Sequence, residues 1–83
     1  PNPFNPTTHV NIQLPERNNL TVSIYDISSR LINTLVNDEV DAGFYSIEWN
    51  GKDKFSQSVP TGVYFMKVIS GDFTATKKMV YIK

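Results

Sequence analysis

The sequence contains no cysteine and only one histidine, His9. The missing cysteines exclude a disulfide bridge, a thiolate metal cluster and a cysteine nucleophile. No apolar run approaches the roughly 20 residues that a membrane-spanning helix requires, so we expect no membrane insertion. Eight basic residues balance eight acidic ones. The chain therefore lacks the overall positive charge that is typical of proteins that bind nucleic acid.

The composition is that of a small folded domain. With 83 residues there is room for one hydrophobic core, so residues 1–83 are predicted to form a single domain. Hydrophobic residues make up 40% of the chain and aromatic residues 12%, which argues against intrinsic disorder. The chain opens with Pro1, Asn2 and Pro3 instead of methionine, which suggests a piece of a longer polypeptide. Because proline favours extended backbone, residues 1–7 are predicted to form an extended junction in which Phe4 packs on the domain.

Alternating apolar and polar residues predict short β-strands. The period of two is clear in Val10–Leu14, Leu20–Tyr25 and Tyr45–Trp49. Val63–Ile69 and Phe73–Ile82 are predicted to pair through a tight turn at Ser70-Gly71-Asp72. Leu31–Val36 reads as a further strand without an identifiable inward face, and Asn37–Gly43 reads as an acidic connection. The expected fold is an immunoglobulin-like antiparallel β-sandwich of about seven strands without a disulfide.

The residue types do not indicate an active site. His9 is alone on the polar side of the first strand, and the acidic residues near Asp41 are neighbours instead of a pair facing across a cleft. We therefore expect no enzymatic activity and no cofactor. Asp38, Glu39, Asp41 and Asp53 offer oxygen ligands for calcium, but the spacing of a calcium-binding loop is absent, and a metal site stays an alternative.

Aromatic residues suggest carbohydrate binding as another alternative. The candidates are Trp49, Phe44, Tyr25, Phe73 and Tyr81. Trp49 is in phase with Tyr45 and Ile47, so it is predicted to lie in the core, whereas Phe44 is predicted to be exposed.

Charge is unevenly distributed along the chain. Six acids and two bases occur through Asn50, whereas six lysines and two acids follow from Gly51 onward. The lysines among them that fall on predicted strands (Lys67, Lys77 and Lys78), together with Lys83 at the end, suit either an edge strand that resists aggregation or a surface that attracts a partner.

Several motifs, taken together, resemble one known family. They are Pro1–Thr8, Ile24-Tyr25-Asp26, Arg30–Val36, Gly43–Gly51, Gly62–Phe65 and the tail Lys77–Lys83. In this order they resemble the C-terminal sorting domains of proteins exported by type IX (Por) secretion. The chain is also similar to the immunoglobulin-like domain of flagellar hook-capping proteins. Two departures occur in loops: Ser28-Ser29 stands where a glycine commonly precedes the arginine, and Ser56-Gln57 replaces a turn that is usually rich in aspartate and glycine.

The resemblance implies a non-catalytic addressing role. The domain would be the C-terminal module of a larger secreted protein, which would pass through the periplasm of a Gram-negative bacterium to the cell surface or medium. Its partners would be the outer-membrane secretion machinery and the covalently linked parent protein, for example a secreted hydrolase. The expected recognition residues are Gly62, Val63, Tyr64, Lys77, Lys78 and Lys83. Pro1, Asn2, Pro3 and Phe4 would form the junction with the parent, and Gly62 is predicted to need a positive φ.

Two rival functions remain. A passive immunoglobulin-like spacer or assembly module, like the hook-capping domain, would leave export unchanged when it is deleted. A small carbohydrate-binding module would be retained on polysaccharide.

Overall fold

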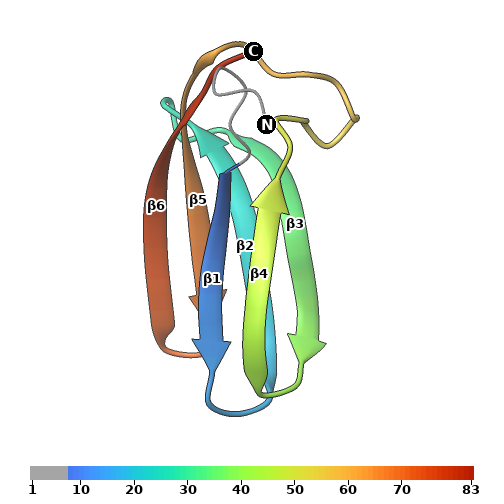
Figure 1. Ribbon diagram of the computed structural model, residues 1–83, viewed down its shortest axis with the longest axis vertical. Coiled ribbons are helices and arrows are strands. Elements are labelled where there is room, and N and C mark those ends of the chain that lie inside the picture. The colour runs from blue at the N-terminus through green and yellow to red at the C-terminus, as the bar shows by residue number, and fades with distance from the viewer. Residues whose placement is uncertain (1–7) are drawn as a thin grey trace.

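The computed structural model describes residues 8–83, which form six strands. The strands are β1 (Thr8–Leu14), β2 (Asn18–Asp26), β3 (Leu31–Val40), β4 (Gly43–Trp49), β5 (Gly62–Ser70) and β6 (Phe73–Tyr81). Strand β1 pairs with β4 in one sheet, and the second sheet has the order β3-β2-β5-β6 (Figure 1). Every pairing is antiparallel. The all-β sandwich is confirmed, although the described residues contain six strands where about seven were expected.

The core lies between the two sheets. Strand alternation turns Leu20, Val22 and Ile24 of β2 inward, and Tyr64, Met66 and Val68 of β5 face the same interior. The smaller sheet contributes Ile12, Ile47 and Trp49.

Trp49 is the centre of this core. It is 1% exposed, and its ring centroid lies 5.1 Å from that of Tyr64 and 5.5 Å from that of Tyr81. The predicted burial of Trp49 is confirmed, as is the exposure of Phe44, of which 82% is accessible.

Strand β3 differs from the prediction because it continues to Val40. The segment Asn37–Val40, predicted as part of a connection, pairs with the start of β2, so the turn into β4 is short. The register between β2 and β3 shifts twice, between Val22 and Ser23 and between Ile24 and Tyr25. Such bulges change which face a residue presents. This is why no inward face could be assigned to Leu31–Val36 from its sequence.

The glycine at the start of β5 does not have the predicted conformation. Gly62 is not among the glycines with positive φ, which in residues 8–83 are Gly43, Gly51 and Gly71. Gly71 has φ 58° and opens the two-residue turn that joins Ser70 to Phe73, as predicted for this hairpin.

Only β3 and β6 lie at the edges of the larger sheet. Lys77 and Lys78 belong to β6 and are edge residues, as suggested by the sequence. Lys67 is not an edge residue, because β5 lies between β2 and β6. Edge protection therefore does not explain Lys67.

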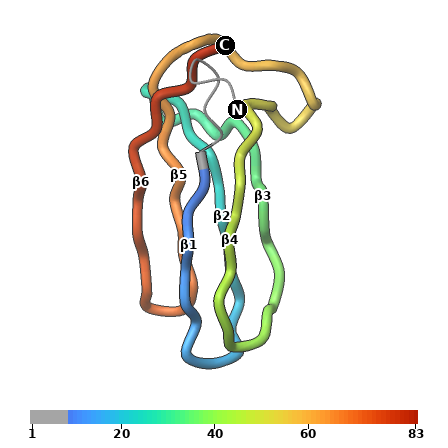
Figure 2. Tube along the Cα trace, in the orientation of Figure 1, coloured from blue at the N-terminus to red at the C-terminus, as the bar shows by residue number. Residues whose placement is uncertain are grey.

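The two ends of the sandwich are formed by different turns and loops (Figures 1 and 2). One end holds the β1–β2, β3–β4 and β5–β6 turns. The other end, which we call the terminal end, holds the β2–β3 turn, the loop from residue 50 to residue 61, and Lys83. The proposed junction residues Pro1, Asn2, Pro3 and Phe4 lie outside the described residues. No helix in residues 8–83 has the length and apolar character needed to span a membrane.

Candidate functional site

A cleft of about 520 Å³ lies at the terminal end of the sandwich. One wall is the β2–β3 turn, residues 26–32, and the other is the segment 58–64. We call this hollow the terminal cleft. It brings together segments that are more than 25 positions apart in the sequence, as Asp26 and Tyr64, which pair at the ends of β2 and β5, show directly.

Asp26 organises the first wall. Its Oδ1 accepts hydrogen bonds from the backbone N–H groups of Ser28 and Arg30, each at 2.9 Å, and its Oδ2 accepts one from Arg30 Nε at 2.9 Å. The backbone N–H of Arg30, followed by its side chain, lowers the pKa of Asp26 below the ordinary value. The carboxylate therefore holds the turn in its charged form.

Tyr64 anchors the second wall. Its hydroxyl donates to the carbonyl oxygen of Pro60 at 2.6 Å, and its ring packs on Trp49. Burial, with the nearby charge of Asp26 as a smaller cause, raises the pKa of Tyr64. The phenol therefore stays protonated and serves as a fixed hydrogen-bond donor at neutral pH.

The loop beside the cleft is tied down at several points. Trp49 Nε1 donates to the carbonyl oxygen of Lys52 at 2.9 Å. The backbone N–H of Lys54 donates to the carbonyl oxygen of Ile32 at 3.0 Å. Asp53 Oδ1 accepts from the N–H groups of Phe55 and Gln57. Together these bonds hold the loop against β3 and give the cleft fixed walls.

The chemistry of the terminal cleft suits binding. Its two carboxylates, Asp26 and Asp53, both accept hydrogen bonds from their own turns. Its rim includes Ile27, 75% exposed, and Leu31, 46% exposed. The rim therefore combines exposed apolar area with a turn that hydrogen bonds hold in place.

The structure separates the residues predicted for recognition into three places. Gly62, Val63 and Tyr64 line the terminal cleft. Lys83 lies beside it, since its backbone N–H donates to Thr61 Oγ1 at 3.2 Å. Lys77 and Lys78 lie farther along β6 on opposite faces. Lys77 Nζ donates to the carbonyl oxygen of His9 at 2.6 Å, whereas Lys78 is in register with Phe65 on the outer face.

Sequence reasoning did not identify Ile27 and Leu31 as site residues, because an exposed aliphatic residue has no pattern of its own. Asp26 did carry a signal. An aspartate followed by Ser28-Ser29 commonly accepts hydrogen bonds from the backbone that follows it, and such turns end strands.

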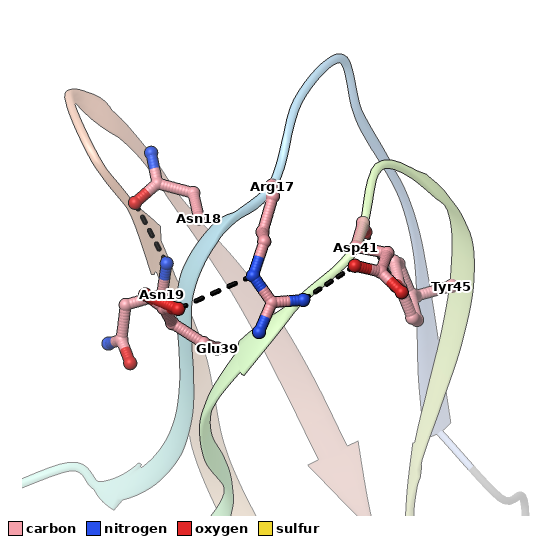
Figure 3. Close-up of polar contacts among 6 residues, drawn as sticks. All are labelled: Arg17, Asn18, Asn19, Glu39, Asp41 and Tyr45. Carbon is pink, nitrogen blue, oxygen red and sulfur yellow. Dashed lines mark hydrogen bonds and ion pairs between the residues drawn. The ribbon is translucent and has the colours of Figure 1, made fainter.

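The four acidic residues that suggested a calcium site do not gather at one place. Asp53 lines the terminal cleft, whereas Asp38, Glu39 and Asp41 lie at the opposite end, where Arg17 bridges Glu39 and Asp41. Arg17 contacts Glu39 at 3.4 Å and Asp41 at 2.5 Å (Figure 3). The hydroxyl of Tyr45 donates to the backbone carbonyl oxygen of Asp41 at 2.6 Å. The hydrogen bond with Asp41 is the main cause that raises the pKa of Arg17. Within residues 8–83, no three histidine, aspartate or glutamate side chains gather where they could hold a metal ion.

The remaining candidate residues are dispersed. His9 is exposed on β1, and its register partner is Glu48. Of the aromatic candidates for sugar binding, Trp49 and Tyr81 are buried, Tyr25 is half-buried, and Phe44 and Phe73 are exposed at separate places.

The two ends of the molecule carry net charges of opposite sign. The end with the β1–β2, β3–β4 and β5–β6 turns carries five acids (Glu16, Asp38, Glu39, Asp41 and Asp72) against Arg17, a balance of −4. The terminal end carries four bases (Arg30, Lys52, Lys54 and Lys83) against Asp26 and Asp53, a balance of +2. The remaining +2 lies along the strands. The asymmetry seen in the sequence is thus an asymmetry between ends, spread over a longest dimension of 36 Å.

Several solved structures resemble the chain, among them the following two. One is the crystal structure of FlgD from P. aeruginosa, with a TM-score of 0.66 and 26% identity over 93% of this chain and 60% of that one. The other is dimeric latent PorU from Porphyromonas gingivalis, with a TM-score of 0.71 and 21% identity over 99% of this chain and 9% of that one. The chain thus spans less than two thirds of either protein. None of the curated proteins matches it.

The PorU similarity concerns the fold. The family comparison is more specific, because the FlgD Ig-like domain family matches residues 2–72, which include β1 to β5 and the terminal cleft. The chain therefore belongs to the FlgD Ig-like domain family.

Proposed function

We propose that this domain is a non-catalytic sorting module that directs a covalently linked parent protein across the outer membrane by type IX secretion. The observation that carries the proposal is the terminal cleft. The strand end at Asp26, the Arg30 turn and Gly62-Val63-Tyr64 come from separate sequence motifs that resemble type IX sorting domains, and all of them line this one cleft.

The physical properties of the cleft support recognition of the folded domain. Its walls are fixed by the hydrogen bonds that Asp26 accepts and that Tyr64 donates. Little conformational entropy of these walls would therefore be lost when a partner binds. Ile27 and Leu31 supply exposed apolar contact, and the surrounding positive charge would favour a partner with an acidic rim. The partner would be a component of the outer-membrane secretion machinery.

The proposal places the parent protein in the periplasm before export and at the cell surface or in the medium afterwards. It requires no turnover by the domain itself. PorU, whose name carries the Por designation of this secretion system, is similar in fold, and this similarity is in keeping with the proposed sorting role.

The family supports a second function. A FlgD Ig-like domain can serve as a spacer or assembly module, and 26% identity with FlgD over 93% of the chain favours this reading. The two functions differ in one property. A spacer would leave export of its parent unchanged when the cleft is altered.

An export assay tests the sorting function. The chain is fused behind a periplasmic fluorescent reporter in a bacterium with type IX secretion. We expect the reporter in the medium or on the cell surface, and we expect Ile27→Asp with Leu31→Asp to keep it in the periplasm. Both side chains are exposed, so the double variant is expected to fold.

Phe44→Asp is the matched control, because it also replaces an exposed apolar side chain but lies on the other sheet. Export that survives the cleft variant, with the domain folded, would contradict the sorting role of the cleft. A reporter that stays in the periplasm with the unaltered chain would favour the spacer.

A further inference from the structure

A second hollow lies on the outer face of the larger sheet, next to the terminal cleft but with no lining residue in common. It has a volume of about 290 Å³ and is lined by Tyr25, Ser29, Phe65, Lys67 and Thr76. We call it the outer hollow. Tyr25 and Phe65 are register partners on β2 and β5, so their half-buried rings lie side by side on the two central strands.

The outer hollow has a positive charge that nothing nearby neutralises. Lys67 is exposed, and its register partners on the neighbouring strands are Ser23 and Thr76. Lys78 is the register partner of Phe65 and is also exposed. Within residues 8–83 the ion pairs use only Arg17 and Arg30, so neither lysine has an acidic partner there.

The surroundings of the hollow are rich in hydroxyl groups. Ser29 and Thr76 line it directly, and Thr21 and Thr74 extend the same face as register partners of Ile69. Hydroxyl side chains both donate and accept hydrogen bonds, which suits a ligand that carries many hydroxyls of its own.

The two central strands of this site cannot pair with a peptide strand, although Thr76 in its lining belongs to the edge strand β6. Both β2 and β5 are interior strands, and their N–H and C=O groups are already paired with strands on either side (Figure 1). A peptide that adds to a sheet needs a free edge. The hollow therefore favours a ligand that binds through side chains alone.

We propose that the outer hollow binds an acidic sugar residue, a uronic acid within a polysaccharide. The apolar face of the sugar ring would stack on Tyr25 and Phe65, its carboxylate would contact Lys67, and its hydroxyls would bond Ser29 and Thr76. The hollow is at the small end of ligand sites, which matches one sugar ring. This site adjoins the terminal cleft through the β2–β3 turn, but it has its own lining residues and does not depend on the export role.

The test is a titration of the isotope-labelled 83-residue chain with tetragalacturonate, followed by amide NMR shifts. We expect saturable shifts on β2, β5 and β6, and weaker binding at high salt. Lys67→Gln is expected to weaken binding roughly fivefold, as for a partly exposed ion pair. Phe65→Leu, which keeps an apolar side chain but removes the ring, is expected to weaken it further.

Matched controls identify the site. Lys52→Gln removes an exposed lysine at the terminal end, and Phe44→Ala removes the most exposed aromatic ring on the other sheet. Neither should change the affinity. A comparable loss in Phe44→Ala with none in Phe65→Leu would overturn the assignment of the site.

Other ligands decide the chemistry. Equal affinity for neutral maltotetraose would overturn the need for a carboxylate, and equal affinity for tetraglutamate would show that the hollow binds acidic peptides instead. An absence of saturable binding at millimolar tetragalacturonate, with the chain folded, would also overturn the proposal.

Discussion

Gly51 provides the sharpest test of how the core is built. It is buried two residues after the end of β4 and has φ 79°, a conformation that costs an L-residue about 1–2 kcal/mol. A Cβ added at this position would lie 2.2 Å from the Cζ atom of Tyr81 and 2.5 Å from its hydroxyl oxygen. Tyr81 is 7% exposed and packed on Trp49, so it has little room to move.

The expected cost of Gly51→Ala follows from these two effects. Displacing a packed ring costs about 1–3 kcal/mol, so the variant should lose about 3 kcal/mol of unfolding free energy in total. A chain of this length is stabilised by roughly 4–12 kcal/mol, so the loss is a large fraction. Urea unfolding monitored by Trp49 fluorescence measures it.

Two comparisons separate the causes. Gly62→Ala should change stability by less than about 1 kcal/mol, because the nearest atom to its new Cβ is 3.8 Å away and its φ is not positive. In a Tyr81→Leu background, Gly51→Ala should cost only the backbone part, about 1–2 kcal/mol. An equal cost in both backgrounds, or a cost below about 0.5 kcal/mol, would refute the steric reasoning.

Three further predictions concern the core, the Asp26 turn and its neighbour. Met66→Ala should reduce the unfolding free energy by about 2–5 kcal/mol in a urea titration, since Met66 is fully buried. Asp26→Asn should destabilise the domain at neutral pH and lose its effect in acid. The folded-state pKa is lowered, so the carboxylate stabilises above its unfolded pKa near 4 and this contribution disappears as pH falls through the folded value, which melting curves from pH 7 to pH 2 would show. Ser29→Gly should raise stability by about 0.5–1 kcal/mol because Ser29 has φ 65°, and an unchanged melting temperature would contradict that reasoning.

The strands with regular alternation could be predicted from the sequence, and β3 could not. In β1, β2 and β4 one face is turned toward the core and is buried or half-buried, so apolar residues recur at every second position. Strand β3 is an edge with two bulges and ends in Asn37-Asp38-Glu39-Val40, so its period is interrupted and its last part resembles a loop. Local pattern was informative only where the local geometry is regular.

The terminal cleft illustrates a different limit. The motifs at Asp26, Arg30 and Gly62–Tyr64 could each be read from the sequence, but their convergence depends on β2 and β5 being neighbours in the sheet. No spacing along the chain encodes that pairing. The same holds for the outer hollow, in which Tyr25 and Phe65 come from strands that are not consecutive.

The two loop departures from the sorting-domain pattern have a common structural basis. In residues 8–83, the non-glycine residues with positive φ are Ser29 and Ser56. Each belongs to a serine-containing pair that departs from a pattern in which glycine is common, Ser28-Ser29 and Ser56-Gln57. The loops therefore keep a backbone conformation that favours glycine, although the glycines themselves are absent.

The separation of charge between the two ends has a consequence for how the domain behaves in solution. At physiological salt an exposed charge is screened within about 8 Å, whereas the long axis measures 36 Å. An approaching surface therefore senses the end that faces it and hardly senses the other. The domain has zero net charge and an isoelectric point near 7.2, yet it would adsorb to both kinds of ion-exchange resin. Its acidic end would face an anion-exchange resin, and its basic terminal end would face a cation-exchange resin. Orientation, and not total charge, decides what this domain attracts.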